Sequence, residues 1–248
     1  MRYFLYLSYK GTNYSGWQIQ PNAMTVQEMI EKAMAVVLRE RVPIAGAGRT
    51  DTGVHAKEMV AHFDLHRDID IEKLPFRLNS FLPKDIAINK IVAVKDDAHA
   101  RFSAISRSYE YYLYFDKNPF LQELAYRHHQ RLDFDLMNLA ANKMIGRHDF
   151  TSFSKLHTSN KTNICKIEQA IWQKKYGCWV FSIKANRFLR DMVRATVGTL
   201  LLVGQGRISI DDFCQIMAAK DRRKAGSSVA ADGLYLVDIE YPDDIFIL

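Results

Sequence analysis

The sequence predicts an α+β protein in two related halves, with largely antiparallel mixed sheets flanked by helices. Aromatic-rich segments alternate with a period of two, helical patterns separate them, and the order of elements begins again after Ser106. We expect the halves to be residues 1–105 and 106–248, with a ligand cleft between them. The second half is no obvious sequence repeat of the first, so the duplication rests on the order of elements.

The first half opens with an alternating, half-buried strand at residues 2–9. Thr25 and Glu28 have the spacing of a capping box, in which each side chain satisfies a backbone N–H at a helix start. The helix should run to about residue 39 and bury Val26, Ile30, Ala33 (or Met34) and Val37. A loop with three glycines follows, and the remaining expected elements are a strand at 59–65, a helix at 71–81 and a strand at 86–94.

The second half repeats this order with a strongly aromatic strand at 109–115 and a helix at 134–145. Segments 163–174 and 178–185 predict a hairpin that turns at Tyr176 and Gly177. The last expected elements are a long helix at 187–203, a helix at 209–219 that begins at Ser209, and a strand at 234–241.

Charge and cysteine content narrow the class of protein. Lys and Arg total 34 against 28 Asp and Glu, which gives a net charge of +6 and suits a polyanionic partner. A basic protein with no nucleic-acid role remains compatible with this excess. Three widely spaced cysteines argue against a disulfide framework and for a reducing compartment. No secretory signal or membrane-length apolar run is visible, so a cytoplasmic enzyme without a membrane partner is the simplest class.

Several common catalytic sites lack their motifs. No phosphate-binding loop of the Walker type and no Gly-x-Ser-x-Gly elbow is present. Gly46 and Gly48 lack the third glycine of a dinucleotide fingerprint. His62 and His66 are four residues apart but fall in a strand-like segment, where that spacing does not converge on a metal. We therefore expect neither a metal nor a cofactor.

The loop 46–56 is the strongest candidate for a site. Its glycines allow a close approach to a ligand, and Asp51 lies two residues from Arg49. A carboxylate near arginines stays ionised, so Asp51 could act as a nucleophile or a base. The alternative is a turn in which Asp51 only caps backbone N–H groups. Residue chemistry leaves both interpretations open.

The string at 48–56, Gly-Arg-Thr-Asp-Thr-Gly-Val-His-Ala, resembles the signature of the bacterial tRNA pseudouridine synthase A family. Further similar segments follow in the same order at 9–18, 99–104, 109–111, 191–198 and 232–237. The resemblance spans residue 3 to about residue 242. It implies the pseudouridine synthase fold and isomerisation of uridine to pseudouridine at positions 38, 39 and 40 of the tRNA anticodon stem-loop, without a cofactor.

The resemblance also implies roles for individual residues. Asp51 takes the position of the essential aspartate, which attacks C1′ of the ribose or removes the C2′ proton to give a glycal. Tyr109 would stack on the uracil and assist loss of the C5 proton, and Arg194 would pair with Asp51. Leu234 would line the uracil pocket, and Arg49 would contact the RNA backbone or help to extrude the base.

Further residues are expected to contact RNA. His99, Arg101 and Phe102 resemble an RNA-contact segment, and His157 and Lys161 align with another whose composition differs from the usual one. The spacing of Arg187, Arg190 and Arg194 places them on one face of the helix predicted at 187–203. The resemblance implies a homodimer with one tRNA spanning both subunits. Thr52 departs from the alanine frequent among relatives, which could alter local hydrogen bonding.

Two rival functions remain for this sequence. A non-catalytic RNA-binding α+β module would use the arginines and aromatic residues, with Asp51 as a loop cap. A carboxylate-based hydrolase acting on nucleosides would instead release free uracil from RNA. The basic run 220–224 is compatible with a solvated loop or with RNA contact.

Overall fold

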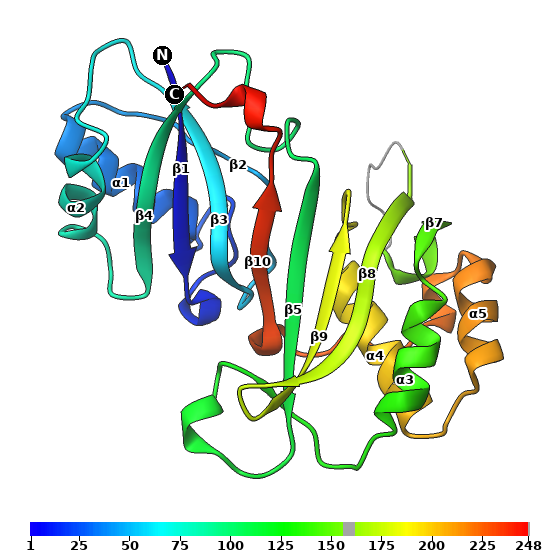
Figure 1. Cartoon of the computed structure of the whole chain (residues 1–248). Coiled ribbons are helices and arrows are strands. Elements are labelled where there is room, and N and C mark those ends of the chain that lie inside the picture. The colour runs from blue at the N-terminus through cyan, green and yellow to red at the C-terminus, as the bar shows by residue number, and fades with distance from the viewer. Residues whose placement is uncertain (156–161, 248) are drawn as a thin grey trace. The chain divides into compact units, whose positions relative to one another are not determined.

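The structure is a computed structural model that describes residues 1–155 and 162–247. The chain forms two compact units (Figure 1). The first unit comprises Met1–Ile105 and Tyr235–Leu248, and the second is the continuous segment Ser106–Leu234. The C-terminal segment therefore returns to the unit in which the chain begins.

The first unit is built on a mixed, largely antiparallel sheet in the order β4-β1-β3-β10. Its strands are β1 (Arg2–Tyr9), β3 (His55–Asp64), β4 (Ile86–Val94) and β10 (Leu234–Glu240), and β2 (Ala45–Gly46) pairs with β3. Strand β1 is antiparallel to both neighbours, whereas β10 is parallel to β3 through Tyr235 opposite His55.

Strand β1 is buried on both faces, so the prediction of a half-buried strand is wrong. The side chain of Phe4 has no exposed surface, although it points to the other face of the strand from the buried side chains of Tyr3 and Leu5. Tyr241 and Phe246 pack edge-on against Phe4, with ring centroids 4.9 and 6.4 Å away. The side chains that bury this face of β1 therefore come from the C-terminal end of the chain, which no local sequence pattern could reveal.

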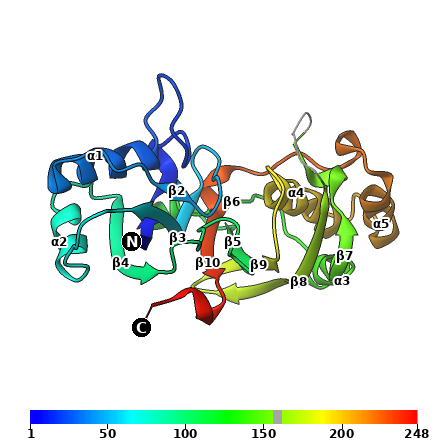
Figure 2. The ribbon, with the colours of Figure 1, turned by 90° about the horizontal axis from the view of Figure 1, so that it is seen from above.

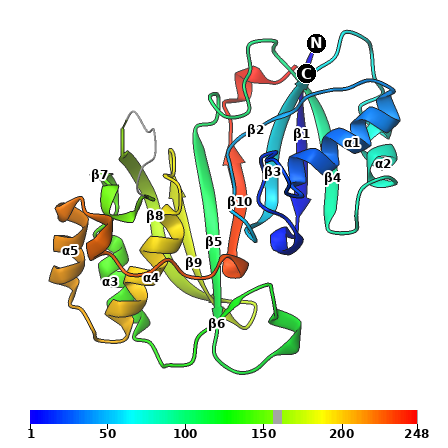
Figure 3. The same ribbon diagram turned by 180° about the vertical axis from the view of Figure 1, so that it is seen from behind.

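The helices of the first unit are α1 (Val26–Leu38) and α2 (Lys73–Asn79), which lie on one face of its sheet (Figures 1 and 3). The predicted apolar stripe of α1 is buried. Oγ1 of Thr25 accepts the N–H of Glu28 at 3.4 Å, as predicted for the N-cap. The Glu28 carboxylate instead pairs with Lys32 at 2.6 Å, so we find only this half of the expected capping box.

The second unit has an antiparallel sheet in the order β5-β9-β8-β7. These strands are β5 (Ser106–Tyr114), β9 (Cys178–Ala185), β8 (Ile164–Lys175) and β7 (Gly146–Asp149), and β6 (Tyr126–Arg127) is parallel to β5. Tyr176 and Gly177 form the predicted hairpin turn, with φ of 54° and 76°. Two positive φ angles are typical of a type I′ turn, whose twist matches that of the flanking strands.

In the described part of the second unit the α-helices are α3 (Phe134–Asn142), α4 (Met192–Gly204) and α5 (Ile210–Ala219) (Figures 1 and 2). Nearly every side of α4 is buried, which makes it the central helix of the unit. Ser209 and Asp212 form a complete capping box at the start of α5. Within residues 1–155 and 162–247, no helix is long and apolar enough to cross a membrane.

The start of α4 differs from the sequence prediction. The helix begins at Met192, because Asp191 has a left-handed backbone with φ of 65°. Arg187 and Arg190 lie before the helix, so their predicted placement on one helix face with Arg194 is wrong. The carbonyl of Arg190 accepts the N–H of Lys155 at 3.0 Å. This long-range backbone bond holds the segment outside a helix.

Candidate active site

Asp51 lies on the loop that connects β2 to β3. Its side chain is half-buried, and its carbonyl accepts the N–H of Val54 at 3.1 Å to close a tight turn. The segment 9–17 holds this loop from outside. The N–H of Trp17 donates to the carbonyl of Thr50, and the N–H of Gly53 donates to the carbonyl of Tyr14, both at 3.3 Å. The two motifs that flank α1 in sequence are thus one structural unit in space.

Two glycines allow this close packing. A Cβ atom on Gly11 would lie 2.0 Å from the carbonyl oxygen of Val54, so the position has no room for a side chain. Gly16 has a φ of 88°, and a Cβ there would lie 2.3 Å from the carbonyl oxygen of Thr50. The imidazole Nδ1 of His55 accepts the N–H of Gly11 at 2.9 Å. This bond joins the end of the loop to the segment 9–17, which we call the clamp.

The exposure of the side chains changes from residue to residue along the loop itself. Thr50 is buried, and its hydroxyl lies 2.9 Å from the hydroxyl of Tyr9. Arg49 and Thr52 are exposed, and Asp51 is half-buried. The clamp therefore fixes the backbone around Asp51, while the arginine beside it stays accessible to a polyanionic ligand.

Arg194 is anchored in the second unit, in the first turn of α4. Its Nε donates to the carbonyl of Val229 at 2.7 Å, and its Nη1 lies 3.5 Å from Oδ1 of Asp191. The hydroxyl of Ser228 donates to Oδ2 of the same carboxylate. The guanidinium is therefore oriented by fixed partners and is not a mobile surface charge.

Arg222 extends this arrangement, and its only signal in the sequence is its place in the basic run 220–224. Its Nη1 donates to the carbonyl of Gly226 at 3.0 Å, and its Nη2 donates to Oγ of Ser228 at 2.9 Å. The chain Arg222–Ser228–Asp191–Arg194 thus supports the guanidinium of Arg194. No sequence spacing identifies such a chain, because Asp191 and Arg194 at the start of α4 meet the distant segment 222–228 only in the fold.

The rest of the basic run at 220–224 is partly neutralised within the protein. Arg223 pairs with Asp221 at 2.9 Å, and Lys220 pairs with Asp149 at 3.3 Å. Together with the internal bonds of Arg222, these pairs favour the interpretation of a structured surface loop.

Tyr109 lies on β5, where its ring meets the ring of Phe188 edge-on at 5.0 Å. Two residues on, the hydroxyl of Tyr111 donates to the carbonyl of Ala230 at 2.9 Å, and burial raises the pKa of Tyr111 well above its usual value. A Cβ on Gly233 would lie 2.8 Å from the ring of Tyr111, so the segment that leads to Leu234 packs closely on β5. Leu234 is itself buried.

The expected RNA contacts have different environments. His99, Arg101 and Phe102 form a compact group in the first unit, with 4.4 Å between the His99 and Phe102 ring centroids. Arg190 is exposed in the second unit, and Arg187 is half-buried. His157 and Lys161 lie outside the described residues.

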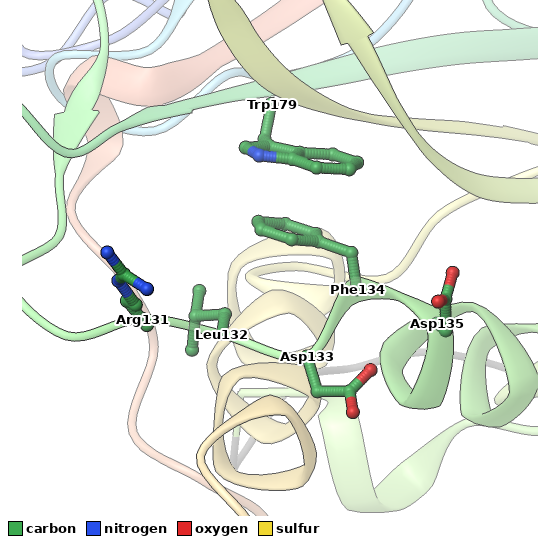
Figure 4. Close-up of a pocket in the computed structure, with 6 residues that line it drawn as sticks. All are labelled: Arg131, Leu132, Asp133, Phe134, Asp135 and Trp179. Atoms are coloured by element: carbon green, nitrogen blue, oxygen red, sulfur yellow. The ribbon is translucent and has the colours of Figure 1, made fainter.

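A shallow cavity of about 550 Å³ lies in the second unit (Figure 4). Trp179 stacks face to face on Phe134 there, with ring centroids 3.6 Å apart. None of its six lining residues is a predicted site residue; they are Arg131, Leu132, Asp133, Phe134, Asp135 and Trp179. Among residues 1–155 and 162–247, we find no group of three or more His, Cys, Asp or Glu side chains that could hold a metal ion.

Mixed, largely antiparallel sheets flanked by helices are the architecture of the pseudouridine synthase fold, and the clamped carboxylate loop fits an enzyme of this class. A model of the family described as tRNA pseudouridine synthase matches residues 6–103 and 140–242. The chain belongs to this family, whose members are isomerases that convert uridine to pseudouridine. The resemblance seen in the sequence motifs is confirmed. The matched ranges include Asp51, Arg194 and Leu234, whereas Tyr109 lies between them.

Individual relatives match nearly the whole chain. The chain is 56% identical over 246 residues to tRNA pseudouridine synthase A of Parabacteroides distasonis, covering 99% of this chain and 98% of the relative. It is 54% identical over 247 residues to the protein of the same name from Bacteroides fragilis, with the same coverage of 99% and 98%. The protein of that name from Bacillus subtilis is 40% identical over 245 residues, which cover 97% of this chain and 99% of the relative.

Proposed function

We propose that this protein isomerises uridine to pseudouridine at positions 38, 39 and 40 of the tRNA anticodon stem-loop. The family match across the regions that hold Asp51 and Arg194 carries the proposal. The clamp around Asp51 supports it, because catalysis needs a functional group held in one position.

The reaction conserves every atom of the substrate. The bond between C1′ of the ribose and N1 of uracil breaks, the base turns, and a bond forms between C1′ and C5. C5 then loses a proton, and N1 ends with one. No electron is gained or lost overall, so the proposal includes no cofactor.

Asp51 acts on the ribose in this proposal. Its carboxylate either attacks C1′ to form a covalent adduct or removes the C2′ proton to give a glycal. Both routes require the carboxylate to be held against the ribose, and Arg194 is proposed to pair with Asp51 and fix its orientation. The fixed orientation of the Arg194 guanidinium supports this role.

The other site residues bind the base and the RNA. Tyr109 stacks on the uracil and assists loss of the C5 proton, and its edge contact with Phe188 limits rotation of its ring. Leu234 lines the uracil pocket, and Arg49 contacts the RNA as the base leaves its stack. Phosphate and base contacts are assigned to His99, Arg101, Phe102, His157, Lys161, Arg187 and Arg190.

The proposal extends to assembly and location. We propose a homodimer that binds one tRNA across both subunits, acting in the cytoplasm, where bacterial tRNA is found. Sedimentation with and without tRNA measures the stoichiometry, and a monomer that binds one tRNA by itself would contradict the dimer.

The test uses the Asp51→Asn variant with unmodified tRNA. The exchange keeps the size of the side chain but removes its charge and nucleophilicity, so pseudouridine should no longer form although tRNA still binds. Asp68→Asn, at an exposed carboxylate, is the matched control and should retain activity. Pseudouridine is detected by chemical tagging and mass spectrometry.

Each rival function has its own outcome in this assay. A non-catalytic RNA-binding module would bind tRNA without any product from the wild-type chain. A hydrolase would release free uracil. Product formation by Asp51→Asn at the wild-type rate would remove the assigned role of the carboxylate.

A further inference from the structure

Phe102 is 75% exposed, and its ring contacts the side chains of His99 and Arg101. A single exposed aromatic residue is ordinary on a protein surface. Here, however, the ring packs against His99 with centroids 4.4 Å apart, and the guanidinium of Arg101 lies 5.4 Å from the ring centroid. An aromatic face combined with a cation is the chemistry that binds a nucleobase and its phosphate.

We define residues 98–103 as the platform segment, and hydrogen bonds fix its backbone. Nδ1 of His99 accepts the N–H groups of Arg101 at 3.1 Å and of Phe102 at 3.4 Å. The N–H of His99 donates to the hydroxyl of Ser103 at 2.9 Å, and the N–H of Ser103 donates to the carbonyl of His99 at 2.9 Å. These bonds close the segment into a compact loop around the His99 ring.

Two long-range bonds attach the platform segment to the first unit. Nη1 of Arg2 donates to the carbonyl of Ala98 at 2.9 Å, and the hydroxyl of Tyr241 donates to the carbonyl of Ala100 at 2.6 Å. The segment is therefore tied to both ends of the chain, and an ordered backbone lowers the entropy lost when a base stacks on Phe102.

His62 lies beneath this segment and no motif assigned it a role. Its side chain is buried, and its ring centroid is 4.4 Å from that of His99. Its Nδ1 accepts the N–H of Ala100 at 3.3 Å. The rings of His62, His99 and Phe102 thus form a column from the core to the surface.

His62 also contacts the strand that leads to Asp51. It pairs with Ala45 in the register of β2 and β3, and it has a hydrogen bond to the backbone of Ala45. Gly46 follows directly and opens the loop 46–56. One buried imidazole therefore contacts both the strand that leads into the loop 46–56 and the platform segment.

Both imidazoles act as hydrogen-bond acceptors, which requires the neutral form. Burial lowers the pKa of His62 to about 4, helped by His99 and Arg2 and opposed by Asp64. Burial also lowers the pKa of His99, helped by Arg2 and Arg101. These shifts agree with the acceptor roles seen in the geometry.

We propose that His62 is a positioning residue that holds Phe102 and Arg101 as a platform for one unstacked base of the RNA substrate and its adjoining phosphate. The proposal rests on the proposed function. It adds the kind of RNA element bound, a single unpaired base, and a residue that acts through others.

The first test compares two substitutions at His62 in steady-state kinetics with unmodified tRNA. His62→Phe keeps a ring beneath His99 but loses the acceptor for Ala100, so KM should rise about tenfold while kcat changes less than twofold. His62→Asn restores an acceptor and should recover much of the loss. His66→Phe, at an exposed position, is the matched control and should leave KM unchanged. Equal KM for His62→Phe and the wild type would overturn the proposal.

The second test does not depend on the stability of the His62 variants. Phe102→Ala removes only an exposed ring, so the melting temperature should stay constant while KM rises about tenfold. Phe102→Trp should show fluorescence quenching when tRNA binds, and adding His62→Phe should diminish that quenching. An unchanged KM for Phe102→Ala would refute the platform. Failure of the proposed function would instead appear as absence of pseudouridine from the wild-type enzyme.

Discussion

The hydroxyl of Tyr9 lies 2.9 Å from Oγ1 of Thr50, which places the end of β1 directly against the residue before Asp51. Both side chains are buried, at 4% and 7% exposure. A hydrogen bond between buried hydroxyls contributes about 1 kcal/mol and is costly to break on one side only. The loop that carries Asp51 is thus held by the core of the first unit, and substitutions of the residues that hold it can be tested.

Gly16→Ala should damage both stability and activity. The new methyl group would meet the carbonyl of Thr50 at a backbone conformation that alanine avoids, which costs about 2 kcal/mol. A shift of the Asp51 backbone by about 1 Å can lower kcat about a hundredfold. Thermal unfolding and single-turnover rates measure the two effects. Gly48→Ala is the control for stability, because a Cβ there meets no atom within 4 Å.

Arg194→Lys should abolish most activity although the charge is kept. Lysine replaces a planar fork with a point charge, so it cannot reproduce the donation to Val229 together with the approach to Asp191. We expect a fall in kcat of about a hundredfold or more. Arg207→Lys, at an exposed arginine beyond the end of the same helix, should retain the wild-type rate. Wild-type kcat in Arg194→Lys would argue against the proposed pairing with Asp51.

Binding of tRNA should weaken as salt rises, because phosphate contacts release counterions. Arg190→Ala should reduce the slope of log affinity against log salt by about one, since it removes the phosphate contact proposed for Arg190. Lys32→Ala changes a charge already paired with Glu28 on α1 and serves as the comparison. Filter binding over a range of salt concentrations gives both slopes. An affinity that is flat in salt would contradict a phosphate-binding surface.

Acid should destabilise the fold through His62. The pKa of His62 is lowered to about 4 in the folded chain, whereas an unfolded histidine titrates near 6.5, so the unfolded state binds more protons between these values. Its contribution is fully present above about pH 6.5 and is lost as the pH falls toward 4, by at most about 1.4 kcal/mol per unit. Urea unfolding from pH 7 to 5 measures it. His62→Asn should flatten the pH dependence, and His66→Asn should not.

The sequence predicted most of the secondary structure because the signals are local. The hairpin turn at Tyr176, the N-caps at Thr25 and Ser209, and the buried stripe of α1 each depend on residues a few positions apart. The start of α4 was mispredicted because Phe188 and Leu189 lie four residues before Met192 and Val193, which is a helical spacing. A tertiary hydrogen bond and the left-handed Asp191 nevertheless keep this segment out of the helix.

The sequence by itself determined the family and the candidate residues, because the motif around Asp51 is specific and further motifs follow in order. Only the tertiary structure revealed what holds those residues: the clamp of Tyr9, Gly11 and Gly16 on the Asp51 loop, and the support of Arg194 by Ser228 and Arg222. The buried role of His62 likewise came only from the structure. The physical reason is that these contacts join residues from separate segments, and a side chain's partners depend on how the chain folds back on itself.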